Sequence, residues 1–275
     1  MIGKANFHTH TTFCDGKELA EDMVLAAMKK GFTALGFSGH SYTHFDKRYC
    51  MSKTGMGEYR DEVWRLKQLY ADKISIYCGI EQDFYSSEPS SDFEYAIGSV
   101  HYIKKEGQFL LVDEMPEIMK KDILEQFGGD PYAYAKVYFE TVEQILQKTN
   151  ADIIGHFDLI TKFNEDNTIF DTTKKRYKDY GIEAIEALIP YDKPFEINTG
   201  AIYRGFRKEV YPSVDFLKEI KNRGGNILFS SDSHDGESLG FGFHEAEKLA
   251  FELGFQSRLV WTPKGFEEVG LSRNQ

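Results

Sequence analysis

The feature that most constrains the fold is a short apolar run that ends in a polar residue of a metal-binding type. Seven such runs recur along the chain and alternate with segments of helical spacing. They cover residues 3–8, 32–38, 74–80, 95–100, 151–155, 194–198 and 226–231. Alternation of short strands with helices is typical of parallel strands joined by helical crossovers. The sequence therefore predicts an α/β fold.

The helices between these strands are predicted from apolar spacing and from their end signals. Asp130-Pro131 is expected to open one helix, with Asp130 as its N-cap. Ser213 is expected to cap another. The predicted helices include 18–30, 57–71, 213–223 and 243–253, with a short helix inside 110–127 and a last short strand over 258–261. Residues 41–56 form a long polar and aromatic loop, which in a compact domain is usually functional or mobile.

The polar residues all follow the C-terminal ends of the predicted strands. In a closed β/α barrel these ends meet at one face, where such enzymes build their sites. An open doubly wound sheet would spread seven strand ends over too wide a crevice for one cluster. We therefore expect a barrel. Because the chain has no linker, low-complexity tract or repeat, we expect a single domain over residues 1–275.

Composition and charge narrow the class of protein. The 275 residues carry a net charge of −11, which disfavours general binding to nucleic acid. The three cysteines form no CxxC pair, which indicates free thiols in a reducing compartment. Met1 to Lys4 leads directly into the first strand, so we expect no signal peptide, and no apolar run is long enough for a membrane span. These observations predict a cytoplasmic protein, and they leave its oligomeric state open.

A metal site is predicted from the strand-end residues. His8 and His10 are two residues apart, so on a strand they project to the same face, and Asp15 follows in the next turn. The candidate ligands are His8, His10, Asp15, His40, Glu81, His101, His156, Asp232 and His234. Nine nitrogen and oxygen ligands exceed the need of one tetrahedral ion and match two or three ions with bridging carboxylates.

These residues resemble the polymerase-and-histidinol-phosphatase (PHP) superfamily from the first strand to the last helix. The pattern is carried by His8-x-His10, Asp15, His40, Glu81, His101, Gly155-His156 and Ser231-Asp232-Ser233-His234. The stretches 155–162, 196–199 and 240–242 are similar to the histidinol-phosphatase branch. The chain departs from that branch at Ser233, where Ala is more common, and in the spacing from Asn198 to Arg204.

The resemblance implies a distorted TIM-like barrel of seven strands, a trinuclear metal site and phosphomonoester hydrolysis. The implied reaction converts L-histidinol phosphate to L-histidinol and phosphate in histidine biosynthesis, by attack of a metal-activated hydroxide. Zinc, iron or manganese would suit these donors. Glu81, Asp232 and His234 are the expected catalytic members. The implied groups are His8, His10, Glu81 and Asp232 around one ion; Glu81, His101 and His156 around a second; and Asp15, His40 and His234 around a third.

A phosphate group also needs protein cations around it. Arg204, Arg207 and Lys162 follow the strands that end near Asn198 and His156, so we expect them on the active face. Arg204 is the first choice, because a guanidinium can contact two phosphate oxygens at once. The loop 41–56 could supply Asp46 or aromatic faces to the cationic end of a small-molecule phosphomonoester.

Other functions remain compatible with parts of this pattern. A second possibility is another phosphoesterase of the superfamily that acts on nucleotides, DNA ends or other small phosphomonoesters, although the acidic charge disfavours DNA. An amidohydrolase-type barrel also begins with His-x-His, but it needs a bridging lysine on a middle strand, and none is in position. A non-catalytic metal-binding protein is disfavoured because every ligand position holds a competent residue.

Overall fold

Seven parallel strands form a barrel in the computed structural model, which describes residues 3–272. In sheet order they are β1 (Lys4–Asn6), β2 (Phe32–Phe37), β3 (Ser75–Asp83), β4 (Tyr95–Ser99), β7 (Ile153–Ile154), β8 (Phe195–Asn198) and β9 (Ile227–Ser230). Sheet order follows chain order without reversal, which excludes a doubly wound sheet. Just beyond β1 and β9, Thr9 and Ser233 form a parallel bridge that joins the last strand to the first. The predicted distorted β/α barrel is confirmed.

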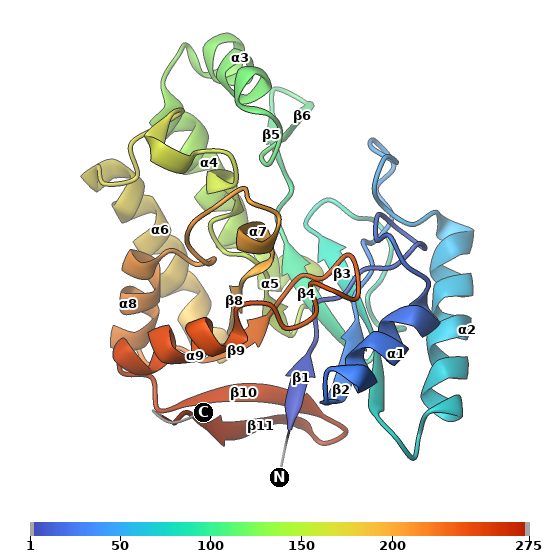
Figure 1. Cartoon of the computed structure of the whole chain (residues 1–275). Coiled ribbons are helices and arrows are strands. Elements are labelled where there is room, and N and C mark those ends of the chain that lie inside the picture. The colour runs from blue at the N-terminus through green and yellow to red at the C-terminus, as the bar shows by residue number, and fades with distance from the viewer. Residues whose placement is uncertain (1–2, 273–275) are drawn as a thin grey trace.

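Helices cover the outside of the barrel, with α1 and α2 on one side and α4, α6, α8 and α9 on the other (Figure 1). The helices are α1 (Ala20–Lys29), α2 (Lys53–Leu69), α3 (Pro116–Phe127), α4 (Pro131–Val142), α5 (Ile145–Thr149), α6 (Lys175–Leu188), α7 (Gly200–Tyr203), α8 (Val214–Asn222) and α9 (Phe243–Glu252). In α1 the buried residues are Ala20, Met23, Val24 and Ala27. This i, i+3, i+4, i+7 spacing places one apolar stripe against the sheet.

The N-terminal end of the barrel is closed by a hairpin that the sequence did not predict. Its strands are β10 (Ser257–Thr262) and β11 (Gly265–Gly270), which lie below the barrel strands in Figure 1. Trp261 and Phe266 pack against an interior cluster that includes Tyr95. The Tyr95 hydroxyl contacts the main-chain oxygens of Phe7 (2.6 Å) and Phe37 (2.9 Å), which ties three strand segments together. The predicted last strand therefore exists, but it is antiparallel and lies outside the main sheet.

The connections between strands differ most from the predictions. An antiparallel hairpin, β5 (Tyr102–Lys105) with β6 (Gln108–Leu111), precedes α3 where only an excursion was expected. Helix α6 was missed, and no helix connects β3 to β4. Helix α2 begins four residues before its predicted start, because Ser52 accepts the Gly55 N–H and caps it.

The predicted entry into the first strand and the predicted domain bounds both include residues that lie outside the described structure. Met1 and Ile2, at the predicted direct entry into the first strand, lie outside the described residues, as do residues 273–275 of the predicted domain. Among residues 3–272, none of the helices has the length and apolar character required to cross a membrane.

Candidate metal centre

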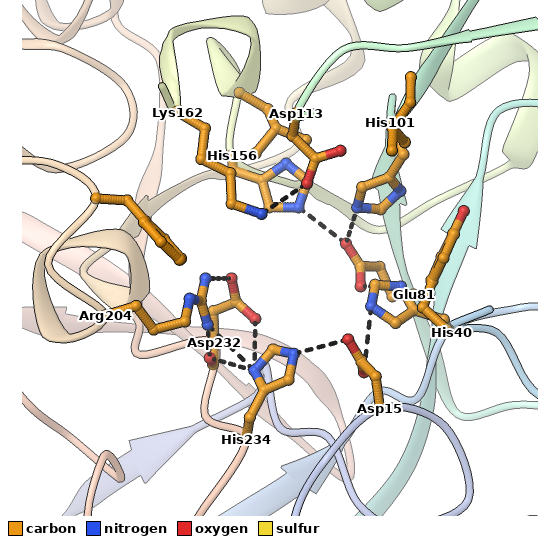
Figure 2. Close-up of a pocket in the computed structure, with 14 residues that line it drawn as sticks. Asp15, His40, Glu81, His101, Asp113, His156, Lys162, Arg204, Asp232 and His234 are labelled. Atoms are coloured by element: carbon orange, nitrogen blue, oxygen red, sulfur yellow. Dashed lines mark hydrogen bonds and ion pairs between the residues drawn. The ribbon is translucent and has the colours of Figure 1, made fainter. Parts of the chain in front are cut away.

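All nine predicted ligands lie together at the C-terminal face of the barrel, and Figure 2 shows seven of them around one cavity. His8 and His10 follow β1, and Asp15 lies in the turn before α1. The others come from separate strands: His40 follows β2, Glu81 lies near the end of β3, His101 follows β4, His156 follows β7, and Asp232 and His234 follow β9. Parallel strands bring these residues to one place although they span most of the chain.

Glu81 lies at the centre of the cluster and contacts imidazoles through both carboxylate oxygens. Its Oε2 is 2.8 Å from His40 Nδ1 and 3.3 Å from His8 Nε2. Its Oε1 is 2.9 Å from His156 Nε2 and 3.4 Å from His101 Nε2. His10 Nε2 also lies 3.5 Å from Oε2, so each oxygen faces a different set of rings. This is the arrangement that a carboxylate shared between two cations requires.

Asp15 and Asp232 hold the remaining imidazoles. Asp15 Oδ2 is 3.2 Å from His234 Nε2, and Asp15 Oδ1 is 3.6 Å from His40 Nε2. Asp232 Oδ1 is 3.2 Å from His10 Nε2. Ligand atoms of His10, Asp15, His40 and His234 lie within 4.8 Å of one another, so the third implied group recurs with His10 added.

Four buried side-chain atoms of the nine predicted ligands make no hydrogen bond among the described residues, and one of them is His156 Nδ1. The other three converge: Glu81 Oε2 lies 3.3 Å from His8 Nε2 and 3.5 Å from His10 Nε2. Buried polar atoms without partners are costly, so their convergence on one point calls for a further bonding group. Imidazole nitrogens and carboxylate oxygens are ligands for zinc, iron and manganese. The donor set therefore fits divalent cations.

The protonation states of Glu81 and His10 suit metal binding, whereas His8 and His40 must each lose a proton to coordinate. Burial disfavours the charged form of these two rings, but the carboxylates around them outweigh it and raise the pKa of both well above the ordinary value. Burial favours the protonated form of Glu81, but the neighbouring imidazoles of His40 and His8 outweigh it and hold the pKa of Glu81 well below its ordinary value. Burial, together with the positive charges of His234 and His40, lowers the pKa of His10 to about 3. An ionised carboxylate and a neutral imidazole are the forms that coordinate metals.

Glu196, in β8, fixes the orientation of His8 from behind. Its side chain is fully buried, and Oε2 is 2.8 Å from His8 Nδ1 and accepts the Ser230 hydroxyl at 2.8 Å. Oε1 accepts the His156 backbone N–H at 2.7 Å and the Asn198 amide at 2.9 Å. With its Nδ1 bound in this way, His8 presents Nε2 to the metal centre. Sequence reasoning gave Glu196 no role, although a charge inside an apolar strand signals a buried partner.

A cavity of about 320 Å³ opens above the cluster. Its lining includes two of the three basic residues that were predicted to contact phosphate, Arg204 and Lys162. Arg204 Nη2 is 2.9 Å from Asp232 Oδ2, and its Nη1 is 3.1 Å from His234 Nδ1. The guanidinium therefore lies at the edge of the metal centre (Figure 2). Lys162 reaches the cavity from the segment after β7, with Nζ 2.7 Å from Asp113 Oδ2.

The structure corrects the prediction for Arg207, which does not line this cavity. Its guanidinium lies 4.7 Å from the centre of the Tyr211 ring and donates to Thr161, in a separate polar pocket that Asp158 also lines. The chain turns at Gly205, whose φ of 73° suits glycine. As a result, Arg204 and Arg207 project into different pockets.

Of the two contributions expected from the long loop, Asp46 or an aromatic face, the loop places an aromatic face in the cavity. The Asp46 carboxylate is held by Arg48 and by the Tyr102 hydroxyl (2.8 Å), away from the cavity. Tyr49 lines the cavity instead, with its ring 4.8 Å from the ring of His40. Its hydroxyl is buried without a partner among the described residues. Nothing in the loop sequence distinguishes Tyr49 from its aromatic neighbours.

The remaining wall of the cavity was also missed from the sequence. It consists of Asp113 with the apolar side chains Leu111, Leu159 and Phe206. Asp113 follows β6, in a segment predicted only as an excursion. A single aspartate in such a segment carries no signal, because its position depends on how the insertion folds back over the barrel.

Comparisons with known proteins identify the family of this chain. The family model of the PHP domain matches residues 6–200. A Schizosaccharomyces pombe protein with the name "Probable histidinol-phosphatase" is 29% identical, over 91% of this chain and 87% of the relative. The Bacillus subtilis histidinol-phosphatase is 22% identical, over 87% of this chain and 97% of the relative. The fold is shared with a crystal structure of histidinol phosphate phosphatase from Lactococcus lactis, in complex with zinc, L-histidinol and phosphate. The two structures match with a TM-score of 0.70 and 23% identity, over 96% of this chain and 98% of that chain.

Proposed function

The chain belongs to the PHP domain family, and on that premise we propose that it hydrolyses L-histidinol phosphate to L-histidinol and phosphate. The observation that carries the proposal is Glu81, whose two oxygens face separate sets of imidazoles at the floor of a cavity. Relatives that align over most of this chain carry the histidinol-phosphatase name. The chain is therefore a metal-dependent hydrolase of the histidine pathway.

We propose that two to three divalent ions of zinc, iron or manganese bind the nine ligands. Glu81 would be shared between two of them, and Asp232 and His234 would hold the edge of the centre nearest Arg204. When bound, such ions lower the pKa of a coordinated water and neutralise charge on the phosphoryl oxygens. Glu196 keeps His8 in the tautomer that can coordinate.

Arg204 and Lys162 are the proposed phosphate contacts. Both line the cavity, and both already neutralise a carboxylate there, Asp232 and Asp113 respectively. A phosphoryl group that enters between them and the metal centre would exchange these partners for its own oxygens. The Arg204 guanidinium offers two parallel N–H donors, which also fix the orientation of the phosphoryl group.

The remaining proposals concern the setting of the enzyme. We propose that residues 1–275 form one phosphatase domain that acts on a small molecule and binds neither nucleic acid nor membranes. Cys14, Cys50 and Cys78 are free, as in proteins of reducing compartments, so we place the enzyme in the cytoplasm.

The test is a phosphate-release assay with purified protein reconstituted separately with zinc, iron and manganese. The substrates are L-histidinol phosphate, nucleoside monophosphates, phosphotyrosine and sugar phosphates. We expect kcat/KM for L-histidinol phosphate to exceed the others by at least about tenfold, the equivalent of ~1.4 kcal/mol. The Asp232→Asn variant, purified in parallel, measures contaminating phosphatase. Preference for a nucleotide would instead support the alternative function, a phosphoesterase of the same superfamily that acts on nucleotides.

A further inference from the structure

One wall of the cavity carries a carboxylate that the metal centre does not use. Among the described residues that line the cavity, the other carboxylates, Asp15, Glu81 and Asp232, all belong to the predicted ligand set. Asp113 lies apart from them beside Lys162, at the top of the view in Figure 2, whereas Arg204 lies at the left. The cavity therefore has a second polar wall away from the guanidinium.

The position of Asp113 is fixed by the backbone. The preceding residue, Val112, donates its N–H to the carbonyl oxygen of His101 at 2.8 Å. This bond ties the segment after β6 to the end of β4, directly beside the metal centre. The Asp113 side chain retains 15% exposure, so it faces the cavity without being free in solvent. Leu111, Leu159 and Phe206 line the same cavity and limit the water around the carboxylate.

We propose that Asp113 binds the ammonium group of an amine-bearing phosphomonoester and so selects for such substrates. The inference rests on the proposed function. It assigns Asp113 to the ammonium group of the substrate, which takes no part in the hydrolysis. L-Histidinol phosphate carries a phosphoryl anion and an ammonium cation a few bonds apart. Asp113 is the carboxylate of the cavity wall that can pair with the ammonium while the phosphoryl group occupies the metal centre.

The pair formed by Asp113 and Lys162 suits a substrate that carries both charges. In the structure Lys162 Nζ neutralises Asp113 at 2.7 Å, so neither of these partly buried charges is left alone. When the phosphoryl group draws Lys162 toward its oxygens, the ammonium group takes the place of Lys162 beside Asp113. Both protein charges then remain paired.

A phosphomonoester without an amine would meet a cost at this site. Its phosphoryl group would compete with Asp113 for Lys162, and it would supply no cation in exchange. A poorly solvated carboxylate without a partner is unfavourable. The Asp113–Lys162 pair thus favours amine-bearing substrates and also disfavours those that lack the amine, which is how many sites achieve specificity.

The test measures kcat/KM for two matched pairs of substrates. The first pair is L-histidinol phosphate and its deamino analogue, 3-(imidazol-4-yl)propyl phosphate; the second is 2-aminoethyl phosphate and ethyl phosphate. We expect the wild type to prefer the amine in both pairs. In Asp113→Asn the amine preference should fall by about 10- to 100-fold, as expected for loss of one charge-assisted hydrogen bond.

A matched control is Asp152→Asn. Asp152 forms a comparable ion pair with Lys193, at 2.9 Å, just before β7 at the opposite end of the barrel, and it does not line the cavity. This variant should keep the wild-type amine preference. Titration calorimetry with L-histidinol gives a second measurement without turnover, in which Asp113→Asn should lose affinity and Asp152→Asn should not.

The outcomes separate this inference from the proposed function. If the wild type hydrolyses L-histidinol phosphate and Asp113→Asn keeps the full amine preference, the role of Asp113 is wrong and the function stands. An equal loss on both members of each pair would also overturn it, because Asp113 would then act only by holding Lys162. If L-histidinol phosphate is not hydrolysed, the proposed function fails, and the aminoethyl and ethyl pair still decides the role of Asp113.

Discussion

The Glu196→Gln substitution should weaken metal binding by changing the tautomer of His8. Glu196 Oε1 accepts hydrogen bonds from two groups that can only donate there. One is the His156 backbone N–H. The other is the Asn198 side-chain NH2, whose orientation is fixed because the Asn198 amide oxygen accepts the Gly200 N–H. The amide nitrogen of a glutamine must therefore replace Oε2 and face His8 Nδ1. To accept that N–H, His8 must move its proton to Nε2, the atom that points at the metal centre.

The expected magnitude is a 10- to 100-fold rise in the dissociation constant of the ion bound by His8, about 1.4–2.7 kcal/mol, as is typical for loss of a group that orients a metal ligand. The measurement is competition with a chelator of known affinity, together with elemental analysis after dialysis at fixed free zinc. Burial disfavours the charged His8 ring, but the carboxylates of Glu196, Asp232 and Glu81 raise its pKa well above the ordinary value. Nitrogen NMR of the histidine rings in the metal-free protein therefore reports the tautomer at a pH high enough to make His8 neutral, where one ring should change its protonated nitrogen.

A matched control is Glu94→Gln, which neutralises a partly buried carboxylate that binds the Cys78 N–H and Lys67. It should leave metal affinity unchanged. The reasoning would be refuted if Glu196→Gln kept wild-type affinity with Nδ1 still protonated. If affinity fell without a change of tautomer, the charge of Glu196 would be the cause rather than its geometry.

Three further predictions follow from the site and the fold. Glu81→Ala should lower kcat/KM by about a thousandfold (~4 kcal/mol) and reduce the metal content, because among residues 3–272 no other carboxylate contacts the imidazoles of both His40 and His156; full activity with full metal content would contradict the shared role. Arg204→Ala should lower kcat/KM by about 10- to 1000-fold, the equivalent of losing ~1.5–4 kcal/mol of charge-assisted hydrogen bonding, with Arg204→Lys recovering only part; wild-type rates would remove it from phosphate binding. Gly181→Ala should lower the free energy of unfolding in urea by about 1–3 kcal/mol, because the new Cβ would lie 2.2 Å from the Phe216 ring. Gly57→Ala, whose Cβ would meet nothing within 4 Å, should instead raise it by about 0.5–1 kcal/mol by stabilising α2. Equal effects of the two substitutions would contradict the packing argument.

The barrel strands and the ligand cluster could be predicted because both depend on local sequence patterns. Each strand is an apolar run, and the parallel arrangement fixes where its C-terminal residue must lie, so His40 and His156 could be placed without knowledge of their partners. The same reasoning failed for Arg207. A short helix and the turn at Gly205 separate it from β8, so its direction depends on local backbone geometry that the sequence pattern does not describe.

The insertions were harder to predict because long-range contacts determine their structure. Phe45 from the long loop stacks on Phe109 of β6 at 3.8 Å, and the Tyr102 hydroxyl bonds to Asp46. Neither segment has a strong periodicity of its own, and their aromatic residues pack against each other across a long distance in the sequence. Tyr49 and Asp113, which line the cavity, belong to these two segments.

This difference indicates how metal chemistry and substrate choice are divided in the molecule. The predicted metal ligands lie mainly at strand ends, where a change of register or length would displace several of them at once and disrupt the cluster. The residues of the outer wall, Tyr49 and Asp113, lie on insertions that contact the barrel through few main-chain bonds, such as that from Val112 to His101. A substitution there can alter which phosphomonoester fits while the ligand geometry stays intact. Mutations that change substrate preference without loss of metal should therefore concentrate in residues 41–52 and 102–115 rather than at the strand ends.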